Sequence, residues 1–229
     1  MFSKETYMAR RAELKKAVGS GLLLFLGNEE SGMNYADNTY DFRQDSTFLY
    51  YFGLPYAGLS AVIDIDNNRD IIFGDELTID DIVWMGTQPT LHEKSEAAGI
   101  KEVLPAADII SYLKKTLASK QTIHYLPTYR PEHQVKLFKW LNILPGTENP
   151  SLPFIMGVVN MRNHKTAEEM VEMDKAANVT ADMHIAAMKM VRPGIRESDI
   201  SAVVAQTAFA NNYPLSFPII ATVNGQTLH

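Results

Sequence analysis

The side chains with the clearest chemical potential in this 229-residue sequence are its six histidines and its acidic residues. The histidines lie far apart, and none shows the short His-to-His spacing by which one helix holds a zinc ion. Asp64 and Asp66 close a predicted hairpin strand, where acidic side chains commonly support turns. The sequence contains no cysteine, no glycine-rich phosphate loop and no Ser, His and Asp motif typical of a hydrolase. Local motifs alone therefore identify no active site.

The composition limits the classes of protein to which the chain can belong. A net charge of −6 argues against a nucleic-acid-binding protein, whose surface would carry a basic patch. No window approaches the ~18 consecutive apolar residues of a membrane span, and the N-terminus lacks the apolar core of a signal peptide. Together with the absence of cysteine, these features favour a cytoplasmic protein that binds neither nucleic acid nor membrane.

The first part of the chain shows the patterns of helices and strands in alternation. An amphipathic pattern predicts a helix over Lys4–Val18, and the wholly apolar run Leu22–Leu26 predicts a buried strand. The polar stretch 27–41 is predicted to form an exposed loop. Apolar and polar residues alternate over Ala61–Asp66 and Asp70–Gly74 around an Asn-Asn turn, which predicts a hairpin.

The middle of the chain continues this alternation. Three helices and a strand are predicted, over the ranges Glu93–Gly99, Pro105–Ser119, Pro131–Leu141 and Gln121–Leu126. The second helix has proline in its first turn and is expected to bury four apolar side chains, Ile109, Ile110, Leu113 and Leu117. Alternating helices and strands indicate an α/β fold.

The best domain boundary follows these elements, where three prolines and a glycine fall within residues 144–153. We predict a first domain over residues 1–160 and a second over residues 161–229. The second domain begins with helices over Lys165–Met190 and Glu197–Asn211, and the methionines of the first helix are expected to pack in a core. The run Ser216–His229 predicts a strand, an Asn-Gly turn and the start of another strand. Two helices and one hairpin strand cannot cover their own apolar faces, so the sequence is predicted to be a fragment.

Several groups of residues, taken in order, resemble a known family. In the first domain they are Arg10-Arg11-x-x-Leu14, Phe42-Arg43-Gln44-Asp45-Ser46-x-Phe48-x-Tyr50-x-x-Gly53 and Trp84-Met85-Gly86. In the second domain they are Met161-Arg162-x-x-Lys165-x-x-x-Glu169, Val191-Arg192-Pro193-Gly194-Ile195-x-Glu197 and the run Phe217–His229. These motifs are similar to those of the Xaa-Pro aminopeptidases (aminopeptidase P), and the resemblance covers nearly the whole chain.

The resemblance implies a fold and an activity. The expected fold is a creatinase-type N-terminal α/β domain with a mixed sheet, followed by the first helices and strand of an incomplete α+β pita-bread domain. Members of the family remove the N-terminal residue from peptides whose second residue is proline, and they use two divalent metal ions, typically Mn²⁺. The resemblance thus implies short proline-containing peptides as substrates and a homodimer or homotetramer as the assembly.

The resemblance also assigns candidate site residues. His229 matches a histidine that lines the active site and contacts substrate, and Trp84 matches a tryptophan that reaches into the active site of a neighbouring subunit. From its residue type alone, Trp84 could equally be an ordinary core or dimer-contact aromatic residue. All five metal ligands of the family lie downstream of the position matched by His229. We therefore expect no metal ligands within residues 1–229 and no hydrolysis by the 229-residue chain.

Two other functions stay open on the sequence. A sister enzyme of the same fold, a prolidase acting on Xaa-Pro dipeptides or a creatinase-like hydrolase, would differ in the residues that line its substrate pocket. A non-catalytic binding module is the other alternative, because histone-chaperone subunits reuse this fold without metals. The sequence lacks the acidic tail of such chaperones, and the motifs at residues 42–53 and at Trp84 favour the aminopeptidase.

Overall fold

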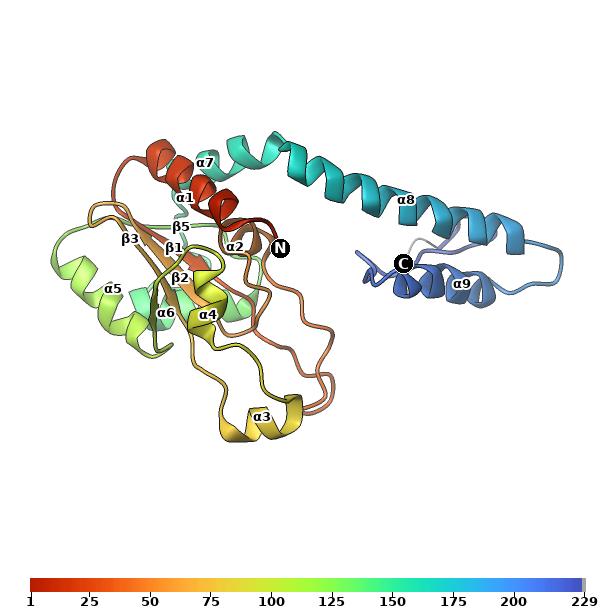
Figure 1. Cartoon of the computed structure of the whole chain (residues 1–229), viewed down its shortest axis with the longest axis horizontal. Helices are drawn as coiled ribbons and strands as arrows, with labels where there is room; N and C mark the ends of the chain where they lie inside the picture. The colour runs from red at the N-terminus through yellow and green to blue at the C-terminus, as the bar shows by residue number, and fades with distance from the viewer. Residues whose placement is uncertain (228–229) are drawn as a thin grey trace. The chain divides into compact units, whose positions relative to one another are not determined.

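The fold is known from a computed structural model that describes residues 1–227, and Figure 1 shows its elements along the chain. The chain divides into two compact units after Asn163. Unit 1 is built on a sheet, whereas unit 2 is built from two helices and the segment that follows them.

The sheet of unit 1 has five strands in the order β4-β3-β2-β1-β5. Their bounds are Leu22–Leu26 for β1, Ser60–Asp64 for β2, Arg69–Phe73 for β3, Glu102–Leu104 for β4 and Ile123–Tyr125 for β5. The pairs β1 with β2 and β2 with β3 are antiparallel, whereas the pairs β1 with β5 and β3 with β4 are parallel. The sheet is therefore mixed, as predicted.

Helices cover both faces of this sheet. Their bounds are Lys4–Val18 for α1, Ser46–Phe52 for α2, Ile79–Met85 for α3, Leu91–Glu96 for α4, Asp108–Ala118 for α5, Pro131–Leu141 for α6 and Leu152–Asn163 for α7. Capping side chains explain where two of these helices begin. The side chain of Ser3 accepts a hydrogen bond from the backbone of α1, and that of Asp45 accepts from the backbone of α2. Pro131 begins α6, where its missing N–H is not needed.

The core of unit 1 forms two layers because β1 is apolar on both sides. Leu23 and Phe25 of β1 face one cluster with residues of α1, α2 and α7, among them Leu14, Phe48 and Phe154. Leu22, Leu24 and Leu26 face the opposite cluster, which is built with α5 and α6 and includes Ile109, Leu113 and Leu137. A strand buried on both faces reads as a continuous apolar run, which is why its pattern predicted it well.

Unit 2 consists of α8 (Ala167–Met190), α9 (Glu197–Ala210) and the residues that follow. Thr166 forms a capping box with Glu169 at the start of α8, and the two helices contact each other. Among its described residues, only Ala208 is buried. The methionines of α8 were expected to pack in a core. That expectation is wrong for Met170, Met173 and Met188, which are exposed.

Other expectations also need correction. Residues 216–227 form no strand, although a strand and turn were predicted there. A strand requires a hydrogen-bonded neighbour, and no other strand of the described chain pairs with this segment. Leu117 was expected to be buried but is 49% exposed, and α5 begins at Asp108 rather than at Pro105. The sequence patterns also missed α2, α3, α7 and the short strand β4.

No helix within residues 1–227 combines the length and the apolar character that crossing a bilayer would require.

Candidate functional site

Trp84 lies on α3, a helix that buries none of its residues. The side chain of Trp84 is 88% exposed, so it is not a core residue of unit 1. Three neighbours on the same helix, Ile79, Val83 and Met85, are also exposed. Figure 1 shows α3 at the end of two long connections that carry it away from the sheet. The helix presents an apolar surface that nothing in unit 1 covers.

The start of α3 is fixed by local hydrogen bonds rather than by packing. Thr78 accepts a hydrogen bond from the backbone N–H of Asp81, and the carboxylate of Asp81 accepts from the backbone N–H of Thr78. The hydroxyl of Thr78 also donates to the carboxylate of Asp81, and this hydrogen bond, together with the one from the backbone N–H of Thr78, lowers the pKa of Asp81 below its usual value. Gly86 ends the helix at a φ of 76°, a conformation that glycine adopts without strain. Trp84 is thus held in an ordered helix although it has no packing partner there.

The second candidate, His229, lies outside the described residues. The structure therefore gives no position for its side chain and tests no role for it.

The other histidines are not arranged to bind metal. His124 and His133 each make hydrogen bonds within unit 1, and His92, His164 and His184 are exposed. No group of three or more His, Cys, Asp or Glu side chains among residues 1–227 is placed to hold a metal ion. The donor set in the described part of the chain does not fit the metal site that the resemblance implies.

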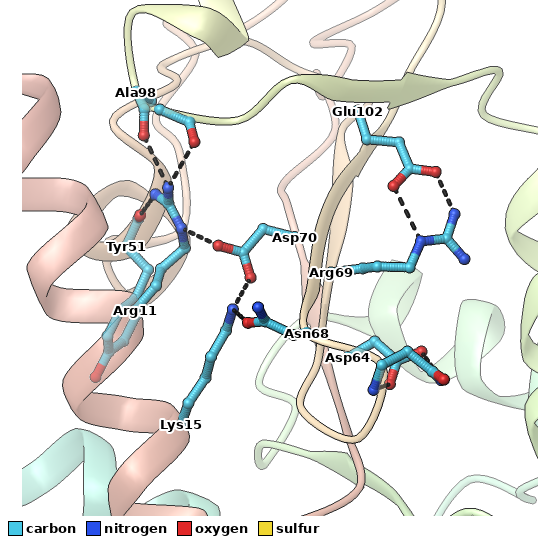
Figure 2. A network of polar contacts seen from close by, with 11 residues as sticks. Arg11, Lys15, Tyr51, Asp64, Asn68, Arg69, Asp70, Ala98 and Glu102 are labelled. Atoms are coloured by element: carbon cyan, nitrogen blue, oxygen red, sulfur yellow. Dashed lines mark hydrogen bonds and ion pairs between the residues drawn. The ribbon is translucent and has the colours of Figure 1, made fainter.

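Arg11, from the first motif, is the centre of a buried polar network (Figure 2). Its guanidinium donates to the carboxylate of Asp70 at 2.9 Å and to the carbonyl oxygens of Tyr51, Ala98 and Gly99. Burial lowers the pKa of Arg11, and the carboxylate of Asp70 opposes that shift. The network joins α1 to α2, to β3 and to the end of α4, so this motif residue organises the fold.

Asp64 forms a second polar centre in unit 1, with Gln121 and Tyr112. Its carboxylate accepts from the side chains of Asn67, Gln121 and Tyr112 and from the backbone N–H of Asn67. Burial alone would raise the pKa of Asp64, but these hydrogen bonds outweigh it and hold the pKa below its usual value. A carboxylate satisfied in this way supports the turn between β2 and β3, as expected for a turn acid.

A cavity in unit 1 lies at the carboxyl ends of the parallel strands β1 and β5. Its volume is about 420 Å³, and it is lined by residues of β1, of the starts of α2 and α6, and of α7. Polar groups from three helices reach it, namely Asp45, Thr47, His133 and Arg162. The sequence patterns missed this cavity, because residues more than a hundred positions apart form it.

Gln44, from the second motif, fixes one rim of the cavity. Its side-chain oxygen accepts hydrogen bonds from the backbone N–H groups of Asn28 and Asp45, both at 2.8 Å. Its amide nitrogen donates to the carbonyl oxygens of Leu54 and Tyr56. Gln44 therefore ties the residues after β1 to both ends of α2.

Comparison with known proteins places the chain in a family. The sequence profile of the aminopeptidase P N-terminal domain matches residues 7–124, more than half of the chain. The chain belongs to this family. A second profile, that of metallopeptidase family M24, matches residues 171–229. The first match lies in unit 1 and the second in unit 2.

Curated relatives carry names that agree with this membership. The chain is 26% identical to a probable Xaa-Pro aminopeptidase of Talaromyces stipitatus, over 96% of this chain and 44% of the relative. It is 25% identical to the Xaa-Pro aminopeptidase of Escherichia coli, over 99% of this chain and 54% of the relative. The chain thus spans about half the length of the curated relatives it matches.

Solved structures of aminopeptidase P share the fold. The low-pH form of the E. coli enzyme matches with a TM-score of 0.76 at 22% identity, over 92% of this chain and 50% of the other. The same enzyme with the inhibitor Pro-Leu matches with a TM-score of 0.75. The α/β architecture with a mixed sheet, predicted from the resemblance, is therefore confirmed.

Proposed function

We propose that this chain is the N-terminal portion of a metal-dependent Xaa-Pro aminopeptidase, which removes the N-terminal residue from peptides with proline in second position. The observation that carries the proposal is the order of the two family matches on one chain, the aminopeptidase P N-terminal domain first and family M24 second. Relatives named Xaa-Pro aminopeptidase match between 96% and 100% of the chain, which supports the same activity.

In this proposal unit 1 acts as a scaffold. Its two charged centres, around Arg11 and Asp64, are occupied in holding helices and turns together. Family M24 is a metallopeptidase family, and the resemblance points to two divalent ions, Mn²⁺ among them. Because the described residues do not fit such ions, we assign the metal ligands to residues other than 1–227 and derive no catalytic step from this chain.

Trp84 and His229 are proposed to contact substrate in the complete enzyme. The apolar surface of α3, with Trp84 88% exposed, is suited to reach a neighbouring subunit, as the resemblance implies for a homodimer or homotetramer. Short proline-containing peptides are the proposed substrates. The absence of cysteine supports a cytoplasmic location as part of the same proposal.

The experiment that tests the proposal starts with the intact mass of the native protein from its source cells. A mass of about 50 kDa is expected if a further domain of ordinary size belongs to the same polypeptide. That protein should release the first residue of an Xaa-Pro-Xaa tripeptide in the presence of Mn²⁺. Preference for an Xaa-Pro dipeptide would favour a prolidase instead. A native mass of 25.6 kDa, the mass of this chain, would refute the proposal that it is a portion of a longer enzyme.

The role of Trp84 is tested in that complete enzyme. Trp84→Ala should lower kcat/KM by about tenfold if the indole contacts substrate across a subunit boundary, since truncating such a contact costs on the order of 1–2 kcal/mol. Val83→Ala is the matched control, because Val83 is also exposed on α3, at 76%. Equal kinetics for Trp84→Ala, Val83→Ala and the parent enzyme would leave Trp84 without a part in the reaction.

A further inference from the structure

Ser151 and His124 form a hydrogen-bonded pair at one edge of the sheet in unit 1. The hydroxyl oxygen of Ser151 lies 2.6 Å from Nδ1 of His124. His124 belongs to the edge strand β5, and Ser151 directly precedes α7. A serine hydroxyl becomes a nucleophile when a neighbouring imidazole accepts its proton, and the two groups must then lie within hydrogen-bond reach. This pair meets that distance requirement.

The second ring nitrogen of His124 determines the direction of the hydrogen bond. Nε2 lies 3.2 Å from the backbone carbonyl oxygen of Ser20. Because a carbonyl oxygen can only accept, Nε2 of the neutral imidazole carries the hydrogen and Nδ1 carries the lone pair. The hydroxyl of Ser151 therefore donates to Nδ1, which is the direction of proton transfer to a general base. The carbonyl group of Ser20 acts as the third group that orients the imidazole.

The backbone holds both members of the pair in place. Gly21 has a φ of 91°, and a Cβ atom at this position would lie 2.7 Å from Nε2 of His124. Glycine adopts this conformation without strain and lets the chain approach the imidazole closely. On the other side, the backbone N–H of Ser151 donates to the carbonyl oxygen of Tyr125 at 3.1 Å. The hydroxyl and the imidazole are therefore preorganised by β5 and by the residues before β1.

The surroundings of Ser151 suit a reaction with a small molecule. The side chains of Ser151 and His124 are half-buried rather than sealed in the core, and the neighbouring Leu152 is 67% exposed. Leu152 begins α7, and the first N–H groups of a helix have no partner within it. In hydrolases with a serine nucleophile, the N–H of the following residue stabilises the developing oxyanion. Leu152 has that position in the sequence.

We propose that Ser151 is a nucleophile that takes the acyl group of a small activated ester, with His124 as its base. The oxygen of Ser151 attacks the carbonyl carbon, and its proton passes to Nδ1 of His124. The bond from the carbonyl carbon to the ester oxygen breaks, and the leaving phenolate takes the proton from His124. The products are an acyl-serine and a phenol, so no further reactant is needed. The site lies within unit 1 and is independent of the proposed peptidase function.

The test treats the full chain with 4-nitrophenyl acetate and locates acetyl groups by mass spectrometry of its peptides. Ser3 is the internal control, because it also stands before a helix and is exposed, but its hydroxyl lies beside Thr6 and not beside an imidazole. Ser151 should be acetylated about 100-fold faster than Ser3, the lower range of what a general base contributes. Equal rates would overturn the proposal.

Unfolding and two variants show whether the geometry is the cause. In urea the two serines should react at similar rates, because the pair no longer exists. His124→Gln should slow acetylation of Ser151 about 100-fold, whereas His92→Gln, at an exposed position on α4, should leave it unchanged. If His124→Gln fails to fold, the comparison of Ser151 with Ser3 in the parent chain decides alone. A preference for Ser151 that persists in urea, or in folded His124→Gln, would overturn the role of His124.

Discussion

The two units of the chain use apolar residues in opposite ways. In unit 1 the sheet supplies two faces, and helices cover both, so that the side chains of β1 are almost completely buried. In unit 2 the helices α8 and α9 contact each other, yet Ala208 is the only buried side chain among residues 164–227. Met188 is 73% exposed and Val191 62%. The difference shows that apolar residues at helical spacing form a core only where a second layer meets them.

This contrast also separates the two kinds of site residue. The motif residues Arg11 and Gln44 lie inside unit 1, where they satisfy backbone carbonyl and N–H groups. Trp84 projects from the same unit without burial. Residues of the family motifs therefore differ in role: Arg11 and Gln44 stabilise the fold of unit 1, whereas Trp84 is exposed on its surface.

The largest expected difference between the units is in hydrogen exchange of the full chain. Amides of β1 and β2 should exchange only through global unfolding, at a free energy of about 5–15 kcal/mol, because they pair in the centre of the sheet. Amides of α8 and α9 should exchange through local opening at much lower free energy, since few buried contacts oppose it. Exchange monitored by mass spectrometry of peptic peptides measures both. Equal protection of β1 and α8 would contradict the contrast.

The second expected effect concerns the buried Arg11 network. Arg11→Met should lower the free energy of unfolding by about 3–5 kcal/mol, because it leaves three backbone carbonyl groups without their donor and Asp70 with Lys15 as its remaining cation. Lys16→Met is the matched control, since Lys16 lies exposed on the same helix and should change stability by less than about 0.5 kcal/mol. Urea denaturation measures both variants. A similar loss for the two would show that Arg11 acts only through its charge on α1.

The sequence predicted best those elements whose pattern is local. The bounds of α1, β1 and α6 agree with the prediction, because amphipathic spacing, a continuous apolar run and an initial proline each mark their own element. The hairpin of β2 and β3 was predicted from its turn. By contrast β4 has only three residues and depends on its pairing with β3, so nothing local marks it.

The sequence predictions failed where tertiary contacts, and not the local pattern, determine the structure. The helix α7 lies in a stretch with Pro153 and Gly157 that looks like a linker, yet Gly157 lets α7 approach Leu14 of α1 closely. The strand predicted over 216–227 had a suitable pattern but no partner. The cavity joins residues of β1, α2, α6 and α7, and no spacing in the sequence reveals such a meeting. Trp84 was found only through its resemblance to a family.

A pH-dependent effect should also distinguish the units. Burial lowers the pKa of His133 in the folded state, so the unfolded chain binds a proton more readily. Stability should therefore be complete above the unfolded pKa of about 6.5 and should fall as the pH is lowered toward the folded pKa, by up to about 1.4 kcal/mol for each unit between them. Urea denaturation between pH 8 and pH 5 measures the slope. His133→Gln should flatten it, whereas His184→Gln, at an exposed position in unit 2, should not.

The smallest effect on global stability is expected from removing the capping residue of α3. The comparison is with the capping box of α4, also in unit 1. Thr78 caps α3, which buries no residue, and Thr90 caps α4, which buries Leu91 and Ser95. Thr90→Ala should lower the free energy of global unfolding by about 1 kcal/mol, because α4 is part of the folded core. Thr78→Ala should leave that value nearly unchanged while α3 frays, since the helix unfolds without opening the core. Hydrogen exchange of the amides of α3 reports the fraying, and a loss of about 1 kcal/mol from Thr78→Ala as well would show that α3 contributes to the global stability of unit 1.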